Sequence, residues 1–370
     1  MGPKRNVNAR GRGRTGFRAL RAMARATKAE PRTQAFRKVM VPYARPVAWK
    51  SWWQLANTFL PLAACWYLAW LALPVSYALT LALGVLCSGF LVRITIFQHD
   101  CGHYAFFRGA RANEVLGHVC TLFNLTPFCF WTRQHADHHR TINNLDRGDR
   151  GLYAECLTVR EYLALPRWKR MVYRITRDPL VFFPLIAPLT LAIGTRIPLM
   201  VKKEWKAERR NIYIANVGLA AFYGALGLTF GWLDVLLVQL PILFIGSAVG
   251  LWLDFLGHKF HASEWVRTPQ WTLSRVAMNG CGHFRLPKVL QWFSGSIGIH
   301  HIHHLNPRIP NYNLRRCHDE NPIFHGARSF RLWDGIRAAW LVLWDEERGR
   351  LITFAEVPEA RSRGMAAAAA

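Results

Sequence analysis

Long apolar stretches divide this sequence into segments long enough to cross a membrane. Residues 51–92 contain no Asp, Glu, Lys or Arg. Because a helix needs about 20 apolar residues to cross the hydrocarbon core of a bilayer, this stretch predicts two spanning helices, at about residues 53–73 and 75–97, with a turn near Pro74. Arg93, near the end of the second helix, is expected to extend its side chain toward the interface.

The same pattern recurs in the second half of the chain. Residues 211–258 contain no Lys or Arg, and the only acids among them are Asp234 and Asp254. This stretch predicts a second helical hairpin, at about residues 212–230 and 235–256. A shorter apolar stretch, residues 180–194, contains two prolines and has basic residues on both sides. We predict that it lies in the interface or re-enters the membrane from one side.

Basic residues are concentrated outside the two hairpins. Residues 1–50 hold 14 Lys or Arg and one acid, Glu30, in a chain of net charge +26. Because cytosolic segments of membrane proteins are enriched in Lys and Arg, both termini are expected in the cytosol. A basic arm directly before an apolar span suits the anionic headgroups of the lipid bilayer, and we do not expect nucleic acid as a partner.

The expected fold is an all-α polytopic membrane protein, with four transmembrane helices in two hairpins and a cytosolic helical cap. We divide the chain into a basic N-terminal arm (residues 1–50), a membrane domain (51–355) and a C-terminal tail (356–370). Since 51% of the residues are hydrophobic and 16 are Trp, one membrane-embedded unit is favoured over two soluble domains.

Three other features of the sequence are not expected to mark a ligand site or a targeting segment. Gly11, Gly13 and Gly16 form a GxGxxG pattern, but no predicted strand precedes it, so a phosphate site is not expected. The first apolar run begins too late and is too long for a secretory signal. The eight cysteines form no CxxC pair, and several lie in apolar runs, so we expect reduced thiols without disulfides or an iron–sulfur cluster.

Three short clusters contain histidines at helical spacing. On a helix, residues i, i+3 and i+4 share one face, so each cluster can direct two or three imidazoles at one point. Neutral imidazole is a good ligand for iron, copper, zinc and nickel. The predicted metal ligands are His99 and His103 in HDCGH, His135, His138 and His139 in HADHH, and His300, His303 and His304 in HHIHH.

His258, at the end of the fourth predicted span, is a further candidate ligand. Asp254 lies four residues earlier, where an unpaired charge would be costly to bury, so we expect it to orient His258 by a hydrogen bond. Further residues expected around the ligands are Asp100, Asp137 and His301. The turn-rich loop at residues 144–151 is either a solvated loop or a gate beside the site. A structural role is expected for the other histidines, His118, His261, His283, His318 and His325.

The number of imidazoles indicates two metal ions, because one tetrahedral zinc ion needs only four ligands. The cap would hold these ions at the inner mouth of the apolar helices, beside the lipid tails. An unactivated methylene reacts only with a strong oxidant, and iron with dioxygen is the usual biological means. The ligand set therefore favours oxidation of an acyl chain.

The motifs HDCGH, QHADHHRTINNLDRG, LTVREYLALPRW and GSIGIHHIHHLNPRIPNYNL resemble those of the membrane fatty acid desaturase family, most closely the bacterial Δ12 or ω6 type. This resemblance implies a non-haem di-iron centre held by the eight cluster histidines. His258 stands at the position of the family's additional histidine, in LGHKF, where many Δ12 members have Gln before it. The bacterial type further implies an inner-membrane protein with its active site in the cytosol.

The resemblance also implies the reaction and its partners. Dioxygen is the co-substrate, two electrons come from an external carrier, and two hydrogens leave neighbouring carbons to give a cis double bond. The acyl chain is carried on a lipid, on coenzyme A or on acyl carrier protein. Because the chain has no HPGG haem motif and no paired cysteines, the electron donor is a separate protein of ferredoxin, rubredoxin or cytochrome b5 type.

Two other classes of function use similar residues. An acyl-chain hydroxylase or acetylenase can use the same histidine clusters, and analysis of the product separates these activities. A metal transporter or sensor predicts metal-binding groups within the membrane, whereas the four predicted spans contain no histidine.

Overall fold

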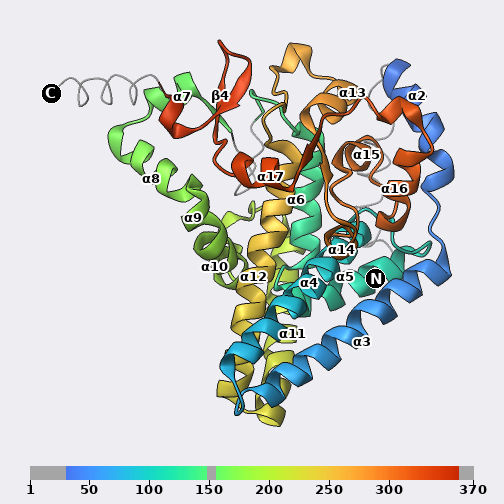
Figure 1. Ribbon diagram of the computed structural model, residues 1–370, viewed down its shortest axis with the longest axis vertical. Helices are drawn as coiled ribbons and strands as arrows, with labels where there is room; N and C mark the ends of the chain where they lie inside the picture. The colour runs from blue at the N-terminus through green and yellow to red at the C-terminus, as the bar shows by residue number, and fades with distance from the viewer. Residues whose placement is uncertain (1–30, 148–155, 358–370) are drawn as a thin grey trace, which may run out of the picture.

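Long helices form the lower part of the molecule, and short helices and strands form a cap above them (Figure 1). The structure, a computed structural model, describes residues 31–147 and 156–357. The GxGxxG pattern, most of the basic arm, residues 148–151 of the turn-rich loop and the end of the C-terminal tail lie outside the described residues.

Within residues 31–147 and 156–357, four helices are long and apolar enough to cross a membrane: α3 (Ala48–Ala72), α4 (Tyr77–Gly102), α11 (Lys206–Phe230) and α12 (Trp232–His258). The predicted fold class, an all-α membrane protein with four spanning helices in two hairpins, is confirmed. Each helix is longer than its apolar stretch. The extra turns carry α4 and α12 into the cap, so that His99 and His258 lie within the last turns of these helices.

Helix α4 is the central helix of the membrane part. In its most apolar window 56% of the residues are buried, compared with 22% in α12 and 28% in α3. It packs against both of these helices. A Cβ atom at Gly246 of α12 would lie 2.7 Å from Cδ2 of Leu91, so glycine is what allows α12 to approach α4 closely.

Arg93 does not extend toward the interface as expected. Its side chain is buried, Nε donates a hydrogen bond to Oγ1 of Thr58 at 3.0 Å, and Nη1 donates to the backbone oxygen of Trp292. The guanidinium carbon also lies 4.0 Å from the centre of the Trp292 ring. Arg93 therefore connects two membrane helices to the short helix α14 (Lys288–Phe293) of the cap.

The apolar stretch at residues 180–194 is helical but follows a bend. Helix α8 (Arg167–Arg177) and the segment Pro179–Gly194 meet at 57°, so the structure contains four candidate spans, or five if this bent pair also crosses. The segment comprises α9 (Pro179–Val181), η3 (Phe182–Ile186), α10 (Ala187–Leu189) and η4 (Thr190–Gly194), and parts of it pack against α12. Its interfacial or re-entrant position stays a prediction.

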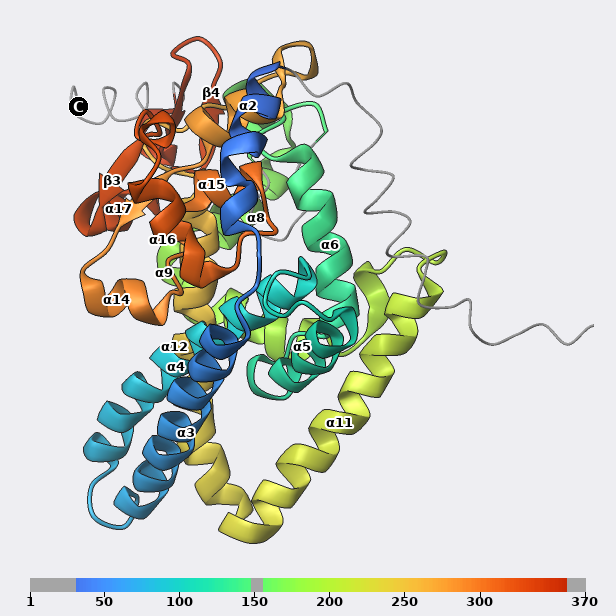
Figure 2. The same ribbon diagram turned by 90° about the vertical axis from the view of Figure 1, so that its right-hand side faces the viewer.

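The cap is built from many short elements. Its helices are α2 (Pro31–Met40), η2 (Val41–Tyr43), α5 (Ala110–Asn124), α6 (Phe128–Thr141), α7 (Val159–Ala164), η5 (Pro198–Met200), η6 (Thr268–Gln270), α13 (Leu273–Arg275), η7 (Val276–Gly280), α14, α15 (His300–Leu305), α16 (Asn311–Asp319), η8 (Pro322–Phe324), α17 (Leu332–Ala338) and η9 (Phe354–Glu356). Figure 2 shows α14, α16 and α17 on one side of the cap.

Two small sheets tie distant parts of the cap together. Strand β1 (Leu157–Thr158) pairs in parallel with β4 (Leu343–Asp345), which pairs antiparallel with β5 (Arg350–Ile352). Strand β2 (His283–Arg285) pairs in parallel with β3 (Ser329–Arg331). Among the described residues, which include every cysteine, there is no disulfide, and seven of the eight thiols are buried.

Candidate metal centre

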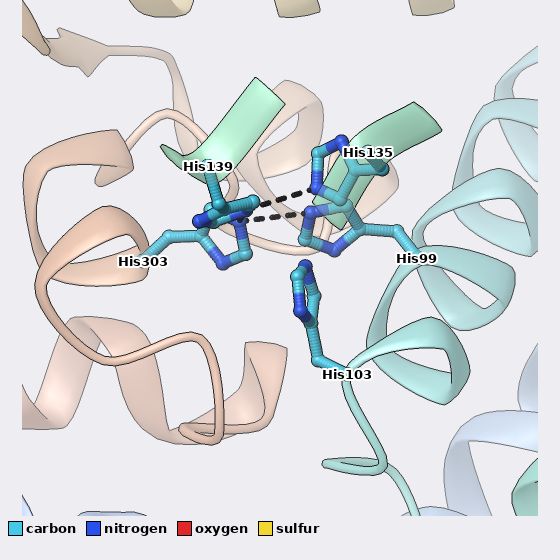
Figure 3. Close-up of side chains that lie close together, drawn as sticks. All are labelled: His99, His103, His135, His139 and His303. Carbon is cyan, nitrogen blue, oxygen red and sulfur yellow. Dashed lines mark hydrogen bonds between the residues drawn. The ribbon is translucent and has the colours of Figure 1, made fainter. Parts of the chain in front are cut away.

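Nine histidines converge in two adjacent groups between the cap and the membrane helices. In each group every residue offers one nitrogen atom, and these atoms all lie within 4.8 Å of one another. The first group is drawn in Figure 3 and comprises His99, His103, His135, His139 and His303; the second comprises His138, His258, His300 and His304.

Helices α6 and α15 each supply ligands to both groups. In α6, His135 and His139 face the first group, whereas His138 faces the second. In α15, His303 faces the first group and the other two cluster histidines face the second. This division differs from the expectation that each cluster aims at one point. Helix α4 contributes only to the first group, through His99 and the following His103, and α12 only to the second.

The nitrogen separations fit metal coordination. Nε2 of His303 lies 3.0 Å from Nε2 of both His99 and His139. In the second group, Nε2 of His300 lies 2.9 Å from that of His258 and 3.0 Å from that of His304. Two nitrogens bound at right angles to one ion, each at about 2.1 Å, would by geometry lie about 3.0 Å apart. The residues present therefore fit a metal ion in each group.

An unpartnered atom supports the same interpretation. Nε2 of His103 is buried and has no hydrogen-bond partner among the described residues. A buried polar atom without a partner is costly, and a bound metal ion would satisfy it. The two groups are close neighbours, because the ring centroids of His139 and His304 lie 4.2 Å apart.

Burial favours the neutral imidazole, which is the form that binds metal. It lowers the pKa of six histidines well below the usual value of 6.5, and the neighbouring imidazoles lower it further, because charge on one ring disfavours charge on the next. These histidines are His103, His135, His139, His300, His303 and His304.

Asp100 lies beside the first group. Its side chain is buried, and Oδ1 lies 3.4 Å from Nδ1 of His99. Oδ2 accepts hydrogen bonds from the backbone N and Nδ2 of Asn311, at 2.7 and 2.9 Å. Gln54 in turn donates to Oδ1 of Asn311 at 2.8 Å. This network joins α3, α4 and the start of α16, and the sequence pattern gave no sign of Asn311 or Gln54.

The ring of His258 is held by residues other than the expected Asp254. Nδ1 of His258 lies 3.1 Å from Oδ1 of Asn143 and 3.6 Å from Sγ of Cys281, while Nε2 faces His300. Both ring nitrogens thus have neighbours without Asp254, which is half-buried on α12. When Oδ1 of Asn143 accepts a hydrogen bond from Nδ1–H of His258, Nε2 is left as the nitrogen for a metal. Asn143 directly precedes the turn-rich loop predicted at residues 144–151, and the sequence pattern gave no sign of its contact with His258.

Two further predicted residues point elsewhere. Asp137 forms an ion pair with Arg140, one turn later on α6. His301 is fully buried and turned away from both metal groups, toward His283 and His318. Both residues adjoin ligands in sequence, but on a helix an adjacent residue faces a different direction.

Small residues make room for the ligand rings. A Cβ atom at Gly257 would lie 2.4 Å from Cδ2 of His300, closer than atoms can approach. Trp131 stacks on the ring of His135, with centroids 4.5 Å apart, and a Cβ atom at Gly102 would collide with that indole. The glycine in LGHKF is therefore explained by the position of His300.

Comparison with known proteins agrees with this site. The sequence model of the family described as fatty acid desaturase matches residues 72–333. A protein named fatty acid desaturase from Bacillus subtilis (strain 168) is 38% identical over 318 residues, covering 86% of this chain and 89% of its own length. The chain belongs to the fatty acid desaturase family. All nine histidines of the desaturase's two groups lie within the matched residues.

More distant relatives carry more specific names. The sn-1 oleoyl-lipid 12-desaturase of Synechocystis sp. is 25% identical, over 68% of this chain and 69% of its own length. An acyl-lipid omega-3 desaturase (cytochrome b5) of Arabidopsis thaliana is 28% identical, over 70% of this chain and 66% of its own length. The desaturase is thus similar to proteins named for different double-bond positions.

Proposed function

We propose that this desaturase introduces a cis double bond into a fatty acyl chain, at the Δ12 or ω6 position, and that two iron ions and dioxygen are used. One observation carries this proposal: nine imidazoles form two adjacent groups that could each hold a metal ion, and three of them, His99, His103 and His258, come from the ends of the apolar helices α4 and α12. Two metal ions at that level would face the hydrocarbon of the bilayer.

The bound metals would supply an oxidant strong enough to remove hydrogen from an unactivated methylene. The overall reaction balances with one dioxygen, two electrons and two protons. The two neighbouring methylenes each lose one hydrogen, a carbon–carbon double bond forms, and both oxygen atoms leave as water. The alternative activity, hydroxylation, would leave one oxygen atom in the acyl chain.

The chain's own residues bind the metal ions, orient the ligand histidines and position the acyl chain. The imidazoles, kept neutral by burial, provide the metal ligands, and Asp100 and Asn143 hold His99 and His258 in position. Helices α4 and α12 carry their ligands at the ends of apolar spans, which keeps the site at the level of acyl chains. Since methylenes differ little electronically, the position of the bound chain selects the carbons that react.

The double-bond position is proposed from the relatives. The name of the Synechocystis protein supports an acyl lipid as substrate and the Δ12 position, while that of the Arabidopsis protein supports an omega-3 alternative. The same Arabidopsis name points to a separate cytochrome b5 as one kind of electron donor. A ferredoxin or a rubredoxin would supply the same electrons.

We further propose that the termini and the metal centre lie in the cytosol, with the protein in a bacterial inner membrane. The absence of Lys and Arg from residues 51–92 and 211–258 supports this orientation. A periplasm-active reporter should be active when inserted in either hairpin turn, near Pro74 or Gly231, and inactive when fused at the C-terminus. The reverse pattern would contradict the proposed orientation.

The proposed function is tested in a bacterial host that makes only monounsaturated lipids and contains a ferredoxin. Mass spectrometry of fatty acid methyl esters should show a new diene with the wild-type protein and none with His138→Ala. The matched control is His261→Ala, which removes an exposed histidine and should leave the diene unchanged. A hydroxylated product, or unchanged lipids despite iron-loaded protein and reduced donor, would overturn the proposal.

A further inference from the structure

Four histidines form a second set outside the two metal groups. The ring of His301 packs against that of His318, with centroids 5.2 Å apart. His318 in turn contacts His283 at 4.4 Å and His325 at 5.0 Å. The sequence predicted no common site for these residues, because they come from β2, α15, α16 and the segment after η8.

These rings form a row from the surface to His301 of α15, the helix that carries three candidate ligands. His325 is exposed, His318 is half-buried, and His301 is fully buried. His301 lies in α15 between two candidate ligands, His300 and His303. His301 is thus the innermost ring of the row, in contact with the rings of His283 and His318.

The surface around the outer end of this row is basic. The paired strands β2 and β3 place Arg285 beside Arg331, and the backbone N of His283 donates to the backbone oxygen of Arg328 at 2.7 Å. These three arginines are exposed, and none has an ion pair among the residues described. Arg315 of α16 is also nearby but pairs with Asp319 at 3.2 Å.

Strand β3, which carries Arg331, lies farther from the long helices than α14 does. Helix α14 exposes the apolar side chains of Val289, Leu290 and Trp292, and it lies at the edge of the cap nearest the long helices (Figure 2). Figure 2 shows β3, α16 and α17 beyond α14, farther from the long helices. A water-soluble protein can therefore reach the arginines while the desaturase is in a bilayer.

We propose that Arg285, Arg328 and Arg331, around His318 and His325, form the docking surface for an acidic protein that carries one electron at a time to the metal centre. This proposal rests on the proposed function, which consumes two electrons per double bond. In each encounter the carrier is oxidised by one electron and the metal centre is reduced by one, so two encounters supply one turnover. We call this surface the basic face.

Two physical arguments select this partner. Opposite charge speeds the encounter of two proteins and orients them, so exposed unpaired arginines favour an acidic partner. Electron tunnelling weakens steeply with distance and is better through packed atoms than through solvent. A carrier docked at the outer end of the histidine row would have packed rings between its redox group and His301, and the backbone of α15 between His301 and the ligands on that helix.

The test measures binding directly, with the full-length desaturase in neutral-lipid nanodiscs and an acidic plant-type [2Fe–2S] ferredoxin as the probe. The variant Arg285→Glu/Arg328→Glu reverses two charges of the basic face. Its dissociation constant should rise at least about tenfold at low ionic strength, and the difference should shrink as salt is added. The matched control is Arg160→Glu/Arg167→Glu, on α7 and α8, which Figure 1 shows across the cap from α16. It should change binding less than about twofold.

Each other outcome overturns the docking proposal. These outcomes are equal affinity for wild type and the basic-face variant, an equal loss in the control, or no binding of ferredoxin, rubredoxin or cytochrome b5 to the wild type. Loss of binding to anionic vesicles, with ferredoxin binding unchanged, would assign the arginines to lipid instead.

Desaturation driven by a small neutral reductant is measured in parallel. If it persists in every variant while ferredoxin affinities do not differ, only the docking proposal fails. If ferredoxin binds as expected but no double bond forms, only the proposed function fails.

Discussion

The Nε2 atoms of His99 and His303 lie 3.0 Å apart, although 204 residues separate them in the chain. His99 ends the first membrane hairpin, and His303 lies in the last histidine cluster. Their contact shows that the first metal group is closed by a helix that follows all four long helices in sequence. The two groups also differ in size, with five histidines in the first and four in the second.

This difference in size predicts unequal effects of ligand removal. His303→Ala leaves four imidazoles in the first group, whereas His304→Ala leaves three in the second. We expect His304→Ala to lose about one metal ion per chain and His303→Ala to retain more. Activity should fall in both variants by at least about 10- to 100-fold, which is the usual loss when a residue that hydrogen-bonds to a metal ligand is removed. Elemental analysis of purified protein measures the metal, with His261→Ala as control. Equal metal loss in both variants would contradict the assignment of the groups.

The contact between Gly257 and His300 predicts a second effect. A methyl group at Gly257 would displace the His300 ring, so Gly257→Ala should cost about 1–3 kcal/mol of stability and weaken metal binding in the second group. Gly250→Ala is the matched control on the same helix, because a Cβ atom there would meet nothing within 4 Å. Thermal unfolding and metal content of both variants test this. A Gly257→Ala protein with wild-type metal content would show that the His300 ring can move without loss of function.

Asn143 should act through His258. Asn143→Ala removes the acceptor for Nδ1 of His258, so metal affinity in the second group should fall by about 10- to 100-fold. Chelator competition should show faster release of one of two metal ions. The adjacent Asn144→Ala is the control, because Oδ1 of Asn144 accepts hydrogen bonds from the backbone N of Asp146 and Arg147 instead of from His258. Asn143→Asp keeps an acceptor and should retain more metal than Asn143→Ala. Uniform release of both ions in Asn143→Ala would indicate general destabilisation instead.

The lowered histidine pKa values predict how the metal-free protein responds to pH. With folded pKa values below the unfolded value of 6.5, the unfolded chain binds more protons in mildly acidic solution. Stability is therefore fully present above about pH 6.5 and falls as pH decreases, by up to about 1.4 kcal/mol per pH unit for each such histidine. Melting temperatures between pH 7.5 and 5.5 measure this. The melting temperature of the metal-loaded protein should fall less over the same pH range. A melting temperature of the metal-free protein that does not change with pH would count against the burial of these rings.

The sequence allowed prediction of the spans and of the ligand types, for physical reasons. A membrane imposes a one-dimensional requirement, a long run without charge, which can be read without knowing any contact. Helical spacing likewise identified His135, His138 and His139 as candidate ligands on one helix, but not that His138 joins a different group from the other two.

Other features depend on contacts between distant residues. Which histidine joins which group depends on how α6 and α15 are rotated relative to each other, and no local pattern records this. Asn143 reaches His258 across 115 residues and adopts a left-handed backbone with φ of 50°. Asp254 was chosen because it lies one turn from His258, but a buried ring is held by whatever packs against it. The strands, each two or three residues long, are too short to show an alternating pattern.

The division of histidines has a consequence for biosynthesis. Four of the five members of the first group are translated by residue 139, before the second hairpin exists, so an early ion could bind there while the ribosome is still at work. The second group has only His138 by then and must wait for residues 258–304. The nascent polypeptide would thus acquire its metals in a fixed order. The two groups would be complete side by side only after the second hairpin has been synthesised, so the proposed two-metal centre would be among the last features of the chain to form.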